Sequence, residues 1–205
     1  MAWAPDYCTA AELKEFVRIG DAVDDSRVAL AITAASRAVD RACNRQFGVL
    51  SVAAARYYTG RYDSDRGRWV VDIDDLMTTS SLVVAVDDDA DLTYGGTITD
   101  YRTVPLNAAA ESRPWTQLVI NDTSTVQPTT TVDAVKVTAL WGWSAVPDAV
   151  KTATLLQSSR FLARRNSPYG IAGSPEQGGE VRLLAKLDPD VGVILGPYRR
   201  WWAAA

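Results

Sequence analysis

The 205-residue sequence contains no histidine, only two cysteines and only three phenylalanines. The absence of histidine excludes Ser-His-Asp and Cys-His catalytic sites, together with the histidine ligands of zinc and haem. Carboxylate chemistry remains available, but the sequence favours a protein that is not an enzyme. Cys8 and Cys43 are too far apart in the sequence for a redox pair or a zinc site. We expect two free thiols near the core, with one disulfide between them as the alternative.

Long apolar runs and a basic excess are also missing. No run reaches the roughly 20 apolar residues that cross a bilayer, and the N-terminus lacks the pattern of a signal peptide. We therefore expect a soluble protein made in the cytoplasm, with no membrane partner. The chain carries 25 acidic against 21 basic residues, a net charge of −4. Tight non-specific DNA binding usually needs the opposite sign, because its affinity comes from neutralising phosphates.

Helical signals lie at both ends of the chain. Thr9 and Glu12 match a capping box, and apolar residues at spacings of three and four from Val28 to Cys43 predict a longer amphipathic helix. Pro147 suits the start of a third helix, which is long and ends near residue 165. Residues 188–195 predict a short fourth helix, closed by a glycine and a proline.

The middle of the chain has the pattern of short strands bounded by turn residues. Connections that resemble hairpins favour antiparallel pairing. We therefore predict an α+β fold, with a helical core of two N-terminal helices, one long helix after residue 147 and a short C-terminal helix, and a large antiparallel β insertion. The expected parts are residues 1–52, 53–141 and 142–205. The predicted strands cover residues 55–59, 68–72, 81–86, 100–104, 117–121 and 134–140.

Two acidic clusters are candidates for metal binding or carboxylate chemistry. Asp87, Asp89 and Asp91 alternate as in an EF-hand loop, but Leu92 and Ile98 stand where the motif needs glycine and glutamate. We therefore expect a solvated hairpin turn and no metal site. The run at 72, 74 and 75 is interpreted in the same way, as acidic surface. Pairs of carboxylates are too frequent in this sequence to indicate a glycosidase. We predict no catalytic residues and no cofactor.

The C-terminal segment contains residue types that often anchor protein interfaces. Trp, Tyr and Arg are enriched in such anchors, and two indoles represent about 10 kcal/mol of gross burial. The segment should dock either on its own domain or on a neighbouring subunit. The basic end of the third helix could contact phosphates or acids of a partner, or simply form a solvated basic face. The predicted partner-binding residues are Tyr198, Arg199, Arg200, Trp201, Trp202, Arg164 and Arg165.

Several of these elements, taken in order, resemble the head-tail connector (adaptor) family of long-tailed double-stranded DNA phages. Tyr7 and the segment from Thr9 to Leu13 are similar to the opening helix of that family. The stretch at 137–143, with Trp141 and Trp143 around a glycine, is the strongest likeness. Residues 91–133 and 201–205 match least. Further similar segments are Cys43-Asn44-Arg45-Gln46-Phe47, Pro105-Leu106-Asn107-Ala108, Asp188-Pro189-Asp190-Val191 and Pro197-Tyr198-Arg199-Arg200.

The resemblance implies a virion structural protein that forms a ring, usually a dodecamer, beneath the portal protein. Such a ring joins the DNA-filled head to other neck or tail-completion proteins, and DNA passes through its lumen without specific binding. The family has no catalytic residues to carry over. The alternatives are another neck component, such as a head-closure or tail-completion protein, and a small β-rich hydrolase or carbohydrate-binding domain that uses aspartates.

Overall fold

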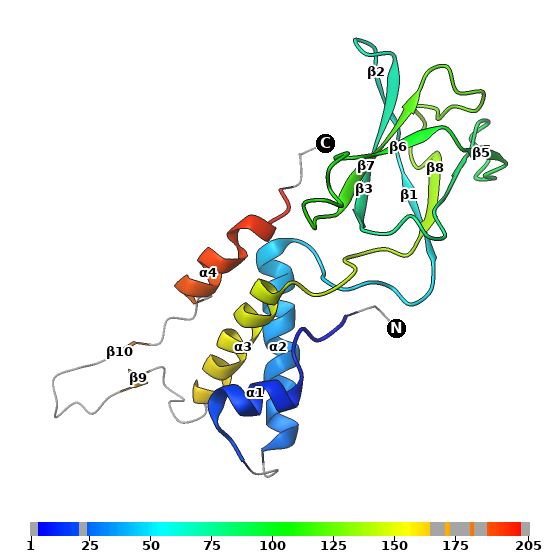
Figure 1. Cartoon of the computed structure of the whole chain (residues 1–205). Helices are drawn as coiled ribbons and strands as arrows, with labels where there is room; N and C mark the ends of the chain where they lie inside the picture. Colours follow the sequence, from blue (N-terminus) through cyan, green and yellow to red (C-terminus); the bar gives the residue numbers. More distant parts are fainter. Residues whose placement is uncertain (1–3, 21–23, 165–170, 173–180, 183–187, 202–205) are drawn as a thin grey trace. The chain divides into compact units, whose positions relative to one another are not determined.

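A computed structural model of the chain describes residues 4–20, 24–164, 171–172, 181–182 and 188–201. It has four helices and two four-stranded antiparallel sheets, which confirms the predicted mixed α+β class. The chain divides into two compact units (Figure 1). The helical unit comprises Met1–Phe47 and Val146–Ala205, and the β unit comprises Gly48–Ala145.

The first two helices of the helical unit begin and end at signals present in the sequence. Helix α1 (Ala10–Val17) starts with the predicted capping box, in which Thr9 and Glu12 each bond the other's backbone N–H. Helix α2 (Asp25–Cys43) ends at Asn44, whose left-handed backbone (φ 52°) turns the chain out of the helix. The face of α2 predicted to be apolar is buried along its length.

The second half of the helical unit follows the β unit in sequence. Helix α3 (Asp148–Ala163) packs against both α1 and α2. Helix α4 (Pro189–Leu195) begins at Asp188, whose carboxylate accepts the N–H of Asp190 and an ion pair from Arg160 of α3 at 3.0 Å. A 3-10 turn, Gly196–Tyr198, follows it. The two-residue strands β9 (Ile171–Ala172) and β10 (Val181–Arg182) pair antiparallel.

The β unit contains two sheets of four strands. One has the order β1-β8-β4-β5 and the other β2-β3-β7-β6, and every pairing is antiparallel as predicted. All six predicted strands are present with shifted ends, and the three-residue strands β2 and β5 were missed. The strands are β1 (Ala54–Tyr58), β2 (Arg61–Asp63), β3 (Arg68–Leu76), β4 (Val83–Val86), β5 (Gly96–Ile98), β6 (Tyr101–Val104), β7 (Trp115–Asn121) and β8 (Val135–Ala139).

A single apolar core in the β unit receives side chains from both sheets. Val137 of β8, Ile73 of β3 and Leu118 of β7 are fully buried in it. Strand β8 shows the predicted alternation, since its odd-numbered residues are buried and the even-numbered ones are half-buried. Trp141 is completely buried in the same core, and its indole N–H donates to the carbonyl of Ala54 at 2.7 Å. Trp141 is therefore a core residue of the β unit.

The interpretation of the second acidic run as ordinary surface is wrong for Asp75. Only 6% of Asp75 is exposed, and its carboxylate accepts the indole N–H of the buried Trp143 at 2.9 Å. Asp74 forms an ion pair with Arg56 at 2.5 Å. The register of β3 against β7 shifts between Asp72 and Leu76. Asp75 lies on the same alternating face of β3 as the buried Val71 and Ile73, so its position in the strand turns it inward.

Candidate docking site

The tail of the helical unit, residues 198–201, is held by its backbone at the C-terminal end of α2. The N–H of Arg200 donates to the carbonyl of Cys43 at 2.8 Å, and the side-chain amide of Asn44 donates to the carbonyl of Arg200 at 3.3 Å. The ring of Tyr198 packs edge-on against Phe47, with centroids 5.9 Å apart. The first part of the tail therefore docks on its own unit, which is one of the two predicted outcomes.

Trp201 behaves differently from the rest of the tail. Its side chain is 83% exposed, although it directly follows the anchored Arg200. Arg199 is exposed as well. Trp202 lies outside the described residues. An indole that remains in water forgoes the free energy of its burial, about 25 cal/mol for each Å². Trp201 therefore remains available to an intermolecular partner.

The structure does not bring the predicted basic residues together with the tail. Arg164 is the C-cap of α3, and the end of α3 lies along the first half of α2, whereas the tail is anchored at the last residue of α2. Arg160 is engaged within the unit by its ion pair with Asp188. Arg165 is not among the described residues. Of the predicted docking residues that the structure describes, Arg164 and the tail residues 198–201 thus belong to opposite ends of the helical unit.

An apolar groove of about 780 Å³ lies at the end of the helical unit far from the tail. It is formed by the C-terminal ends of α1 and α3 and the first half of α2, which lie together at the bottom of Figure 1. Two charged residues, Asp24 and Arg27, line it and form an ion pair with each other at 3.1 Å. The apolar side chains that line it include Val17, Ile19, Leu30, Phe161 and Leu162. No signal in the sequence indicated this groove.

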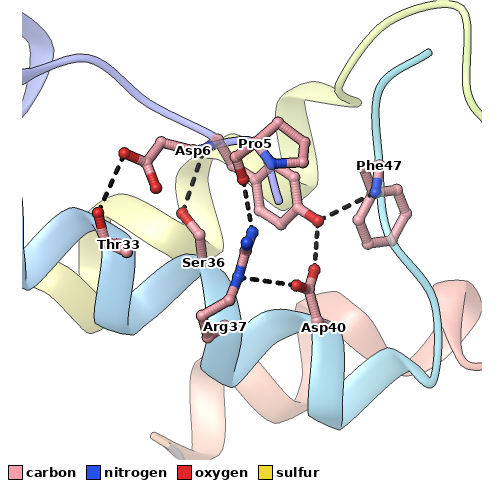
Figure 2. A network of polar contacts seen from close by, with 8 residues as sticks. Pro5, Asp6, Thr33, Ser36, Arg37, Asp40 and Phe47 are labelled. Atoms are coloured by element: carbon pink, nitrogen blue, oxygen red, sulfur yellow. Dashed lines mark hydrogen bonds and ion pairs between the residues drawn. The ribbon is translucent and has the colours of Figure 1, made fainter. Parts of the chain in front are cut away.

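Figure 2 shows a polar network that fixes the N-terminal segment on α2. The hydroxyl of Tyr7 donates to the carboxylate of Asp40 and accepts the backbone N–H of Phe47 at 3.0 Å. Arg37 forms an ion pair with the same carboxylate at 2.9 Å, and Ser36 accepts the backbone N–H of Tyr7 at 3.1 Å. The hydrogen bonds of Tyr7 join residues that are 29 to 40 positions apart in the sequence. They hold Phe47 in the place where the tail docks.

Burial governs the protonation of this network. It raises the pKa of Tyr7, and the hydrogen bond to Asp40 raises it further, so Tyr7 stays a hydrogen-bond donor at all physiological pH values. Burial also raises the pKa of Asp40, although Tyr7 and Arg37 both oppose that shift. The network joins structural elements, and its groups already bond one another. Its role is to position Phe47.

The loop between β4 and β5 holds the other cluster of acids. The carboxylate oxygens of Asp87, Asp89 and Asp91 lie within 4.8 Å of one another. Both oxygens of the buried Asp87 accept backbone N–H groups, from Ala90 and Leu92, each at 2.9 Å. Asp87 therefore organises the hairpin turn that the sequence predicted. Desolvation and the neighbouring Asp91 raise the pKa of Asp89.

Both cysteines are free and buried, as predicted. Burial raises the pKa of Cys8 to about 11 and the pKa of Cys43 to about 11. Since the thiolate is the nucleophile, these thiols are poorly suited to react at neutral pH. They act as small apolar residues of the helical unit.

The comparisons with known proteins add no relative to this description. The sequence matches no model of a known protein family, and no curated protein matches it. Among the residues that the structure describes, no helix has both the length and the apolar character needed to span a membrane.

Proposed function

We propose that the chain is a head-tail connector of a long-tailed DNA phage, a virion structural protein and not an enzyme. One observation carries the proposal. Three segments that resemble the connector family, although far apart in the sequence, meet around Phe47. Tyr7 contributes a ring 5.6 Å from that of Phe47, and Tyr198 contributes a ring 5.9 Å away. The backbone of Arg200 bonds Cys43, at the start of the third segment.

This convergence gives the resemblance a physical basis. Separate short motifs are weak evidence when each could arise by chance, but here they build one packed cluster. The order of the elements also supports the proposal. Two helices precede the β unit and two follow it, and all four belong to one compact unit. The resemblance implies a helical core that carries a β insertion.

In the proposed role, copies of the chain form a ring, expected to be a dodecamer, beneath the portal protein. The ring would bind other neck or tail-completion proteins on its far side, at the head-tail interface of the virion. A dodecamer would carry a formal charge of about −48. Such a charge disfavours adhesion of DNA phosphates, so the genome could pass through the lumen without specific binding.

The proposal is tested by removing the chain from an infection. A phage with a nonsense codon in this gene, grown in a non-suppressing host, should yield DNA-filled heads and separate tails that do not join. Electron microscopy of the lysate would count the two, and mass spectrometry of wild-type particles should detect the chain. Normal complete particles from the mutant, or particles that lack the chain, would refute the proposal. The suppressed mutant, grown in parallel, is the matched control.

A further inference from the structure

We propose that Trp201 of one copy inserts into the apolar groove at the far end of the helical unit of the next copy. The inference deepens the proposed function, because it names the contact that would join copies into a ring. It begins with two complementary surfaces on one chain. The groove offers about 780 Å³ lined largely by apolar side chains, and Trp201 offers an indole that is 83% exposed.

The groove is shaped for an apolar occupant. Leu30, which is 71% exposed, lines it together with the half-buried Phe161 and Leu162. The ion pair between Asp24 and Arg27 already satisfies much of the charge at its edge. A volume of about 780 Å³ falls within the range of sites that enclose an organic group of more than one ring. A large aromatic side chain therefore suits the groove better than a charged one.

The residue that precedes Trp201 is held in place by hydrogen bonds. The N–H and the carbonyl of Arg200 are both bonded to the end of α2, at 2.8 and 3.3 Å. The residue that precedes the indole is therefore ordered before any partner arrives. Pre-ordering reduces the entropy lost on association, and tryptophan is among the residues that most often dominate interfaces.

The geometry excludes insertion within one copy. Ala34, the lining residue nearest to the end of α2, is nine residues from Cys43, which corresponds to about 14 Å along the helix. Trp201 is one residue beyond the anchored Arg200, and consecutive Cα atoms are only about 3.8 Å apart. The indole therefore cannot reach the groove of its own chain. The indole that fills the groove therefore comes from a second copy, to which this limit on distance does not apply.

A contact between two different surfaces has a consequence for assembly. Once two copies are joined, the pair retains one unused groove and one unused indole, so association is head-to-tail and continues until a ring closes. A two-fold dimer through identical surfaces would stop at two copies. The inference thus predicts a series of oligomers from the chain alone, before any portal protein is present.

Engineered cysteines provide the test. In the full chain, Ala34→Cys places a thiol on the exposed edge of the groove, and Arg199→Cys places one beside the indole. Within one copy, Ala34 lies nine residues, or about 14 Å, before the end of α2, where the tail is anchored. This distance exceeds the span of a disulfide. The natural cysteines are buried and should not compete. Oxidation of the double variant, alone at high concentration and bound to portal rings, should give a ladder of dimers, trimers and larger species.

Two further substitutions show whether the indole and the groove produce the ladder. Trp201→Ala and Leu30→Lys, each added to the double-cysteine chain, should weaken association at least about thirtyfold and remove the ladder. The matched control is Leu92→Lys in the β4–β5 loop, where the side chain is 73% exposed, and it should leave the ladder intact. Circular dichroism would verify the fold of each variant.

The outcomes separate the inference from the proposed function. A ladder that survives Trp201→Ala or Leu30→Lys, cross-linking that stops at dimers, or no cross-linking in either condition overturns the inference. A connector that joins heads to tails without this contact would leave the proposed function standing. A ladder that depends on both residues, from a chain absent from virions, would support the inference and overturn the proposed function.

Discussion

Replacing Tyr7 by phenylalanine should destabilise the helical unit by about 2–4.5 kcal/mol. The substitution keeps the ring that packs 5.6 Å from Phe47 and removes only the hydroxyl. That hydroxyl makes one hydrogen bond to the carboxylate of Asp40 and one to the N–H of Phe47. A bond to a charged group contributes about 1.5–3 kcal/mol and a neutral one about 0.5–1.5 kcal/mol. Their loss accounts for the expected range.

Urea unfolding followed by circular dichroism at 222 nm measures this effect, because the signal comes mainly from the helices. With a slope of about 2 kcal/mol per molar urea, the midpoint should fall by about 1–2 M. Tyr62→Phe is the matched control, because Tyr62 is 42% exposed on β2 and should change stability by less than about 0.5 kcal/mol. A midpoint for Tyr7→Phe equal to that of the control would refute the role assigned to the network.

Three other predictions concern stability and reactivity. Trp143→Phe should destabilise the β unit by about 1.5–3 kcal/mol in thermal unfolding, because the indole N–H bonds the buried carboxylate of Asp75; a change under 0.5 kcal/mol would contradict this. Glu12 and Lys151 form an ion pair that lowers the pKa of Glu12 and raises that of Lys151. Lys151→Gln should therefore lower the stability at pH 7, and this loss should vanish as acid protonates Glu12; a loss that persists in acid would refute it. Both cysteines should resist a thiol reagent at pH 8 in the folded chain and react fully in urea, whereas rapid labelling of the folded chain would contradict their burial.

The sequence predicted those elements whose signals are local. The capping residues of α1 and the three-to-four spacing on α2 are properties of neighbouring residues, and both features are present in the structure. Strand β8 was predictable for the same reason, since its alternation matches a half-buried sheet. Strands β2 and β5 have only three residues each, too few to establish an alternating pattern.

The candidate site depends on contacts that no local pattern encodes. Tyr7 meets Asp40 across 33 positions, and Asn44 meets Arg200 across 156. The composition of the tail predicted that it binds a protein surface. It could not distinguish Tyr198, which is docked, from Trp201, which is exposed. The groove arises from three helices that approach one another in space. Asp75 was assigned to the surface because it is an acid in an acidic run, and the indole of Trp143 that bonds its carboxylate comes from 68 positions further along the chain.

In the proposed role, this chain binds a portal ring and builds a ring of its own on it. The most direct test mixes the purified chain with purified portal rings of the same phage and examines them by cryo-electron microscopy. We predict a second ring of regularly spaced copies on one face of every occupied portal. Portal rings that remain bare at saturating concentrations of the folded chain would contradict the account.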